Sequence, residues 1–331
     1  MKKKILLMGE SGVGKTSMRS MVFAGYLAHN TSRLKYTKGI EYSHIKFAGE
    51  LVFHILDCGG RQGFMESYFL NKSMSIFKNV DVFIYVFDIS ATFDMDVFRK
   101  CSIYLKQYSP EAKIYCIINK IDIIHCDEIK QIVDNKMQLI KIANNADSIE
   151  FYSTSILNET VYMAWSHIIQ HIMRTYLDIE PKLTQFVNMI EANEVFLIER
   201  SSMLIIAKRH LYDIVQYNND THQKYPSSFE TNICNSDQCI ADNKTCTRNV
   251  YSSSCSTETI TRVFKIFQIQ IKTFDTVKEI EFCFENLYIF FKLIMPNIYI
   301  LIVINKYIPS FILKNNITIL VEFLQPLAKK Y

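Results

Sequence analysis

The stretch "MGESGVGKTS" at residues 8–17 directly follows "KKKILL" and fits the pattern G-x-x-x-x-G-K-[ST] at every fixed position. A predicted buried strand precedes it and a predicted helix follows it, which is the setting of a phosphate-binding loop. Glycines permit the tight torsions that let successive N–H groups point into one concavity for phosphate oxygens. The stretch therefore predicts a nucleotide-binding α/β fold, and a glycine-rich turn is the alternative interpretation.

Two side chains of this loop have predicted roles. Lys15 would reach the β and γ phosphates as a point charge, and the Thr16 hydroxyl would hold Mg²⁺. The N-terminal end of the following helix adds to the affinity for an anion.

Apolar runs with strand character alternate with helical stretches along the first half of the chain, at residues 4–9, 44–49, 51–57, 81–90, 113–122 and 149–156. Such alternation is typical of an α/β domain whose mostly parallel sheet has helices on both faces. The runs at 44–49 and 51–57 lie too close for a crossover helix, so we expect an antiparallel hairpin that turns at Gly49 and Glu50. The predicted sheet is therefore mixed.

The string "NKID" at residues 119–122 follows an apolar strand, and so lies at the carboxyl edge of the sheet, where open α/β sheets bind ligands. The Asp122 carboxylate can accept both N1–H and N2–H of guanine, which adenine does not offer. Asn119 and the stem of Lys120 would orient and cover the ring. The string predicts a preference for guanine.

A third element, "LDCGG", also ends a strand. Asp57 would bind Mg²⁺, mostly through water, and the Gly60 N–H would meet the γ phosphate. Loss of that phosphate would free the segment "GGRQGFMESYF" at residues 59–69 and change the surface. Thr37, between the first helix and the hairpin, is a candidate Mg²⁺ ligand in the triphosphate state.

The length of 331 residues favours two domains, and Pro181 at a predicted helix start marks a boundary between residues 1–178 and 179–331. Residues 212–258 are rich in Asn, Ser, Thr, Asp and Cys, which is typical of a loop inserted outside a core. Around this insertion we predict a helix at 183–194, strands at 195–200 and 202–209, and helices at 261–280 and 315–330.

The stretch "LYIFFKLIMPNIYILIVI" at residues 287–304 is long and apolar enough to be read as a membrane span. Lys292 and the turn signal of Pro296 and Asn297 interrupt it. The two halves are rich in β-branched and aromatic residues, so we predict a buried hairpin instead.

The composition gives no support for nucleic-acid binding or for a disulfide framework, and only weak support for a zinc site. The net charge of +4, from 37 Lys and Arg against 33 Asp and Glu, is too slight to predict nucleic-acid binding. Nine cysteines without a signal peptide indicate reduced thiols in a cytosolic protein. Paired C-x₂-C motifs are absent from the insertion, so a zinc site is weaker there than a plain polar loop; its cysteines are Cys234, Cys239, Cys246 and Cys255.

Taken together, the motifs resemble those of the guanine-nucleotide switches, and within them the Rag (Gtr/Rag) type, in particular its Rag A branch. The strings "DCGG", "FMESYF" and "IEANEVFLIER" carry the Rag type, beside nucleotide motifs that many GTPases share. The resemblance covers nearly all of residues 1–206 and only faintly the rest.

This resemblance implies a GTPase with GTP or GDP and Mg²⁺ as cofactors. Residues 1–178 would be a G domain, and residues 179–331 a smaller α+β roadblock/longin-like domain for pairing with a Rag C-type GTPase. It implies relaying amino-acid sufficiency to the target-of-rapamycin kinase complex. The location would be cytoplasmic, with recruitment to the lysosomal or vacuolar membrane through a scaffold complex, because residue 2 is Lys and "AKKY" offers no prenylation cysteine.

Matching motifs also imply the site residues. Phosphates would contact Ser11, Gly12, Val13, Gly14, Lys15, Thr16 and Ser17, with Thr31 and Thr37 from the first switch and Gly60 from the second. Guanine would contact Asn119, Lys120, Asp122, Ser155 and Ile156. Mg²⁺ would contact Thr16, Thr37 and Asp57.

Two positions depart from the family. Rag A-like proteins usually have His where Asn119 stands, and base binding should survive that change. Where the family has the Gln that orients an attacking water, this chain has Arg61 followed by Gln62, so the catalytic candidates are Lys15, Arg61 and Gln62. We expect slow hydrolysis. A GTP-locked scaffold is the alternative, and "NKID" disfavours a small-molecule kinase or ATPase.

Overall fold

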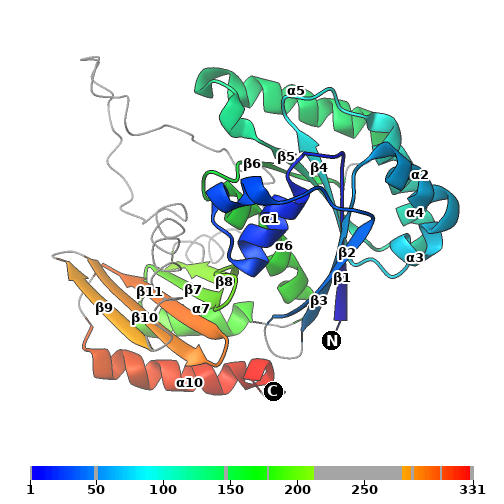
Figure 1. Cartoon of the computed structure of the whole chain (residues 1–331). Coiled ribbons are helices and arrows are strands. Elements are labelled where there is room, and N and C mark those ends of the chain that lie inside the picture. Colours follow the sequence, from blue (N-terminus) through cyan, green and yellow to red (C-terminus); the bar gives the residue numbers. More distant parts are fainter. Residues whose placement is uncertain are drawn as a thin grey trace, which may run out of the picture.

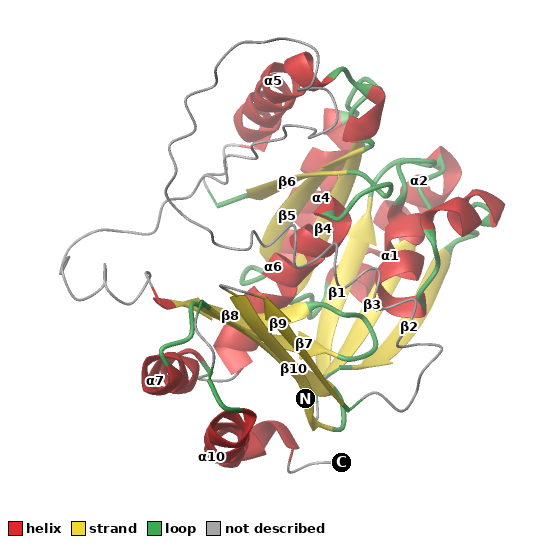
Figure 2. Ribbon diagram, turned by 90° about the vertical axis from the view of Figure 1, so that its left-hand side faces the viewer, coloured by secondary structure: helices red, strands yellow, loops and turns green. Residues whose placement is uncertain are grey.

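The computed structural model describes residues 2–47, 51–144, 148–176, 179–211, 278–284, 287–305 and 308–328. Two sheets organise these residues (Figure 1): one of six strands in the order β2-β3-β1-β4-β5-β6, and one of five in the order β8-β7-β11-β10-β9. Helix α5 and helix α10 lie at opposite ends of the molecule in both views (Figures 1 and 2).

The six-stranded sheet is mixed, as predicted. Its strands are β1 Lys2–Met8, β2 Ile40–Lys46, β3 Val52–Cys58, β4 Val82–Asp88, β5 Lys113–Asn119 and β6 Glu150–Thr154. All neighbouring pairs are parallel except β2 and β3. The antiparallel hairpin is therefore confirmed, with β2 beginning earlier than expected, while the turn predicted at Gly49 and Glu50 lies outside the described residues.

Helices cover both faces of this sheet. They are α1 Lys15–Ala24, α2 Gln62–Asn71, α3 Ser73–Phe77, α4 Met95–Tyr108, α5 Cys126–Asn144 and α6 Thr160–Tyr176, with short 3₁₀ helices η1 Ala28–Arg33 and η2 Ile121–Ile123. Because side chains alternate along a strand, Ile5 and Leu7 pack with α1 and α6, whereas Leu6 and Met8 pack with α2, α3, α4 and α5. This explains why the second half of β1, residues 5–8, is apolar at every position.

The five-stranded sheet is antiparallel throughout. Its elements are α7 Glu180–Ile190, β7 Glu194–Glu199, β8 Ile205–His210, β9 Glu279–Phe284, β10 Leu287–Met295, β11 Ile298–Ile304 and α10 Ser310–Ala328. Pro181 lies in the first turn of α7, as predicted for a helix start. The hairpin that turns at Pro296 and Asn297 is confirmed, and none of the described helices is long and apolar enough to cross a membrane.

The helix predicted at 261–280 is wrong at its C-terminal end, which is a strand. The helix expected at 261–280 lies outside the described residues up to residue 277, and Glu279 and Ile280 begin strand β9. Cross-strand pairing decides this, since Glu279 pairs with Lys292 on β10, where the carboxylate and the ammonium are 3.1 Å apart.

One of the apolar clusters spans both parts of the structure. Ile169 and Met173 of α6 belong to the same buried cluster as Ile206 of β8 and Phe186 of α7. The backbone N–H of Ile205 also donates to the hydroxyl of Ser166 on α6, at 3.1 Å. The boundary between residues 178 and 179 stays a prediction, and helix α6 contacts both sheets.

Candidate functional site

The predicted site residues come together at the carboxyl edge of the six-stranded sheet. Strands β1, β3, β4, β5 and β6 run parallel, so their C-terminal ends meet at one edge. The phosphate loop follows β1, and the two other motifs follow β3 and β5.

The phosphate loop needs glycine at two positions where the chain has it. Gly9 has φ +140° and Gly14 has φ +100°, a region that side chains other than glycine rarely adopt. A Cβ on Gly9 would lie 2.2 Å from the carbonyl oxygen of Val86, and one on Gly14 would lie 2.4 Å from Nδ2 of Asn119. The loop is therefore packed against β4 and β5 in a fixed shape.

Lys15 lies inside this loop with only 6% of its surface exposed. Its Nζ donates to the carbonyl oxygens of Gly9 at 2.8 Å and Glu10 at 2.6 Å. Burial lowers the pKa of Lys15 to about 8, and the nearby Asp57 carboxylate offsets part of that effect. An anion such as a phosphate would supply the charge that stabilises the buried ammonium.

Three oxygen side chains gather beside Lys15. The Thr16 hydroxyl lies 2.8 Å from the Thr37 hydroxyl and donates to Oδ2 of Asp57 at 2.8 Å. Asp57 is fully buried, and its Oδ1 has no hydrogen-bond partner in the described part of the chain. Hydroxyl and carboxylate oxygens are ligands that Mg²⁺ prefers. These residues fit the ion that the sequence predicts.

Other metal centres receive no support where the structure can be described. Among the described residues, no group of three or more His, Cys, Asp and Glu is placed to hold a metal ion. The four cysteines of the insertion, proposed as a weak zinc site, lie outside those residues. Cys58, Cys101, Cys116 and Cys283 are free thiols.

Arg19, which was not predicted from the sequence, connects this cluster to the edge strand β2. Its Nε donates to Oδ2 of Asp57 at 3.1 Å, its Nη1 to the Ser43 hydroxyl at 2.9 Å and its Nη2 to Glu41 at 2.5 Å. The signal was available in part, because Arg19 lies one helical turn after Lys15 on the same face of α1. Its partners on β2 could not be read from the sequence.

Asn119 ties the base loop to the phosphate loop. Its Nδ2 donates to the carbonyl oxygen of Val13 at 2.8 Å, and its Oδ1 accepts from the Thr154 hydroxyl at 3.0 Å. The side chain is 1% exposed. Both ends of its amide are thus engaged by protein groups, which hold the base loop to the phosphate loop.

The carboxylate expected to read the base is held in place by a neighbouring loop. Oδ1 of Asp122 accepts a hydrogen bond from the hydroxyl of Ser155. The same hydroxyl accepts from the N–H of Leu157 at 3.1 Å. Ile156 lies between Ser155 and Leu157 in the chain and is partly buried against the apolar cluster that spans both parts. The segment after β6 therefore positions Asp122.

Asp88, at the end of β4, positions Lys120. It too was not predicted from the sequence. Nζ of Lys120 lies 2.6 Å from Oδ2 of Asp88. Burial raises the pKa of Asp88, but the hydrogen bonds from Lys120 and Ser90 lower it more, so the net pKa is below its ordinary value. The carboxylate stays ionised and holds the lysine stem beside the base loop.

The segments after α1 and β3 lie against each other and against the phosphate loop. The N–H of Gly59 donates to the carbonyl oxygen of Gly39 at 2.7 Å, and the hydroxyl of Tyr68 donates to the same oxygen at 2.6 Å. A Cβ on Gly60 would lie 2.3 Å from the carbonyl oxygen of Gly9. Gly60 is therefore in close contact with the phosphate loop.

The remaining catalytic candidates, Arg61 and Gln62, have different partners. The guanidinium of Arg61 lies over the ring of Tyr36, with Cζ 3.5 Å from the ring centroid. Gln62 is exposed, and its Nε2 donates to Glu66, one turn along α2, at 3.3 Å.

Other predicted residues are less engaged. The Thr31 hydroxyl donates to the carbonyl oxygen of Ala28 within η1, so it is satisfied locally. Ser11 and Gly12 are exposed at the tip of the phosphate loop, Val13 is buried in the core, and Ser17 is partly buried on α1.

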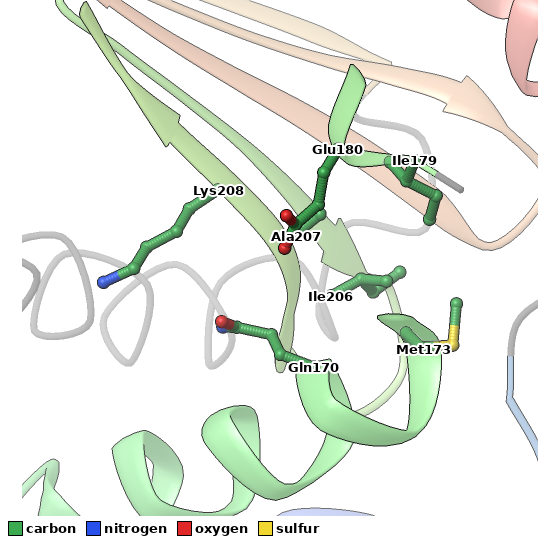
Figure 3. Close-up of a pocket in the computed structure, with 7 residues that line it drawn as sticks. All are labelled: Gln170, Met173, Ile179, Glu180, Ile206, Ala207 and Lys208. Carbon is green, nitrogen blue, oxygen red and sulfur yellow. The ribbon is translucent and has the colours of Figure 1, made fainter. Parts of the chain in front are cut away.

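A cavity between α6, α7 and β8 is too small to compete as a ligand site (Figure 3). It holds about 10 Å³, room for about one water molecule. Gln170 lines it, with its amide nitrogen donating to the carbonyl oxygen of Ile205 at 3.2 Å. This cavity therefore offers no alternative to the carboxyl edge of the larger sheet as a nucleotide site.

The chain is similar to proteins of one G protein family. Residues 4–234 match the family described as "Gtr1/RagA G protein conserved region". The chain is 42% identical over 210 residues to "Ras-related GTP-binding protein A" of Dictyostelium discoideum, covering 62% of this chain and 70% of that protein. It is 41% identical over 211 residues to "GTP-binding protein gtr1" of Schizosaccharomyces pombe, covering 62% and 68%.

The chain is also similar to relatives of the B and C types, with lower identity to the C type. The chain is 26% identical over 216 residues to "Ras-related GTP-binding protein C" of Homo sapiens, covering 62% of this chain and 53% of that protein. With "Ras-related GTP-binding protein B" of Rattus norvegicus, 37% identical, the match covers 64% of the relative. The chain thus spans roughly two thirds of the relatives of the A and B types.

Proposed function

Because the chain belongs to the Gtr1/RagA G protein family, we propose that it is a Rag A-like switch that binds GTP with Mg²⁺ and hydrolyses it slowly. It would act as one half of a heterodimer with a Rag C-type GTPase. The observation that carries the proposal is the convergence of Thr16, Thr37 and Asp57 beside the buried Lys15. Asp122 lies at the same edge of the sheet.

Each part of the site has a task in binding the nucleotide. The backbone N–H groups of the phosphate loop and Lys15 would hold the phosphates, and Asp122 would accept the two N–H groups of guanine. Thr16, Thr37 and Asp57 would hold Mg²⁺, which supplies positive charge to neutralise the phosphate oxygens when bound. Asn119 and Asp88 would keep the base loop and Lys120 in position.

Slow hydrolysis follows from the chemistry at position 61. A glutamine can accept and donate hydrogen bonds at once, and so can orient an attacking water. Arginine only donates, and its guanidinium does not lose a proton in proteins. The Gln62 amide is exposed and donates to Glu66 within α2. Neither side chain would orient the water as an amide does.

Replacing Arg61 with glutamine is expected to raise the rate of GTP hydrolysis about tenfold or more, because the amide restores an acceptor for water. Single-turnover assays with protein loaded with GTP and Mg²⁺ would measure this. Gln62→Ala is the matched control and is expected to leave the rate unchanged. Equal and fast rates in the wild type and the Arg61→Gln variant would contradict the proposal.

The second sheet is the proposed pairing surface. Family membership supports a heterodimer, and an α+β element with a five-stranded antiparallel sheet follows the nucleotide domain. We expect co-expression with a Rag C-type chain to give a 1:1 complex on size exclusion, and co-expression with a second tagged copy of this chain to give none. Recovery of this chain alone in both cases would contradict the pairing.

Signalling roles follow as part of the same proposal. The heterodimer would relay amino-acid sufficiency to the target-of-rapamycin kinase complex, from a cytoplasmic pool recruited to lysosomal or vacuolar membranes by a scaffold complex. The alternative is a scaffold whose GTP is structural and is not hydrolysed measurably. Arg61 is the observation that favours it, and the single-turnover assay separates the two.

A further inference from the structure

We propose that Arg61 is a positioning residue that makes the site prefer GTP to GDP, by holding the first switch segment closed through a stack on Tyr36. The first switch segment is residues 31–39, and the second is residues 59–69. The inference rests on the proposed function, and it assigns to Arg61 a role that differs from the water-orienting role of the glutamine it replaces.

The contact itself is a close stack between the two switch segments. Cζ of Arg61 lies 3.5 Å from the centroid of the Tyr36 ring, well inside the reach of a cation–π contact. In the part of the chain that the structure describes, Arg61 makes no ion pair, so the ring is its partner. Lys38 lies farther from the same ring, at 5.8 Å.

The stack affects the expected Mg²⁺ ligands because Tyr36 directly precedes one of them, Thr37, in the chain. Tyr36 is 47% exposed, whereas its neighbour Thr37 is 7% exposed. The Thr37 hydroxyl lies 2.8 Å from that of Thr16. Fixing the Tyr36 ring on the outside therefore restrains the backbone that carries the Thr37 hydroxyl on the inside.

A second connection between the switch segments lies on the other side of Thr37. The carbonyl oxygen of Gly39 accepts from the N–H of Gly59 at 2.7 Å and from the hydroxyl of Tyr68 at 2.6 Å. Thr37 is thus bracketed by two contacts to the second switch segment. The two segments close over the site as one unit, with Gly60 against the phosphate loop.

GTP is expected to stabilise the closed form of this unit more than GDP does. Thr37 and the Gly60 N–H are the groups expected to meet the γ phosphate and its Mg²⁺, and GDP offers no γ phosphate. A contact that exists only in the closed form raises the affinity for the ligand that binds the closed form better. Arginine suits this task because its planar guanidinium stacks on aromatic rings.

The test measures dissociation constants of a non-hydrolysable GTP analogue and of GDP, with Mg²⁺, for the intact chain and its variants. Tyr36→Leu and Arg61→Ala are each expected to lower the affinity for the analogue about two- to fivefold, the range of an exposed cation–π contact. The affinity for GDP is expected to stay unchanged. The double variant is expected to be no weaker than either single variant, because both remove one contact.

Two controls separate the stack from other causes. Tyr36→Phe keeps the ring, so it is expected to keep the wild-type ratio of GTP-analogue to GDP affinity. Lys38→Ala removes the more distant cation and is expected to change that ratio less than Arg61→Ala does. An equal effect of Lys38→Ala would show that the net charge of the segment matters and would overturn the role of the stack.

The remaining outcomes are decisive as well. If wild-type protein shows no preference for guanine over adenine nucleotides, the proposed function falls and this inference falls with it. If that preference is intact but Tyr36→Leu leaves the ratio unchanged, or weakens both nucleotides equally, only the role of Arg61 is overturned. Additive losses in the double variant would overturn it too.

Discussion

Replacing Asp122 with alanine is expected to lower the affinity for GTP about a thousandfold and to remove the preference for guanine. The carboxylate would accept two N–H groups of the base, and each charge-assisted hydrogen bond is worth about 1.5–3 kcal/mol. The base would then contact the loop only through nonspecific packing. Isothermal titration with GTP and ATP measures both the loss of affinity and the loss of preference.

The Asp122 prediction has a matched control and an intermediate variant. Asp96→Ala removes an exposed carboxylate on α4 and is expected to leave nucleotide affinity unchanged. Ser155→Ala removes the hydroxyl that holds Asp122, so a smaller loss is expected. A fully retained guanine preference in Asp122→Ala would show that the base is read elsewhere.

Replacing Lys15 with methionine is expected to lower the affinity for GTP a hundredfold or more, because two or more charge-assisted contacts to phosphate are lost, each worth about 1.5–3 kcal/mol. The stability of the nucleotide-free protein is not expected to fall. Burial lowers the pKa of Lys15 from 10.5 to about 8. At pH 7 the charged side chain therefore costs about 3 kcal/mol of folding free energy, a cost present below pH 8 and lost above 10.5.

Nucleotide titration and thermal unfolding of the nucleotide-free protein check the two halves of the Lys15 prediction. Lys106→Met, on the exposed side of α4, is the control and is expected to change neither quantity. Normal GTP binding by the Lys15→Met variant would contradict the proposed role of the phosphate loop in binding the phosphates. A large fall in its melting temperature would show that Lys15 stabilises the fold in its own right.

The sequence predicted the nucleotide domain well, because its signals are local. The alternation of strands and helices, the hairpin order and the positions of the three motifs depend on periodicity and on turn residues close in the chain. The packing of Ile5 and Leu7 on one face and Leu6 and Met8 on the other agrees with the prediction of a sheet covered on both sides.

Contacts between distant segments could not be predicted in the same way. Arg19 reaches Glu41 and Ser43 only because β2 pairs with β3 in one particular register. Arg61 and Tyr36 meet through two loops whose conformations have no periodic signal. The lone residues at these positions look ordinary until the sheet brings their segments together.

Helix and strand signals were ambiguous in the second part of the chain. "KEIEFCF" alternates charged and apolar residues, which suits the strand β9, yet the apolar residues before it favoured a helix. Pairing with β10 decided the outcome. In contrast, Pro296 and Asn297 gave a clear turn, and the hairpin was predicted correctly.

Calorimetric titration of the purified chain with GTP and with ATP, in the presence of Mg²⁺, tests the central claim most directly. The account predicts binding of GTP at least a hundredfold tighter than binding of ATP, because Asp122 pairs with two N–H groups that only guanine offers. Equal affinity for the two nucleotides, or heat from neither, would contradict it.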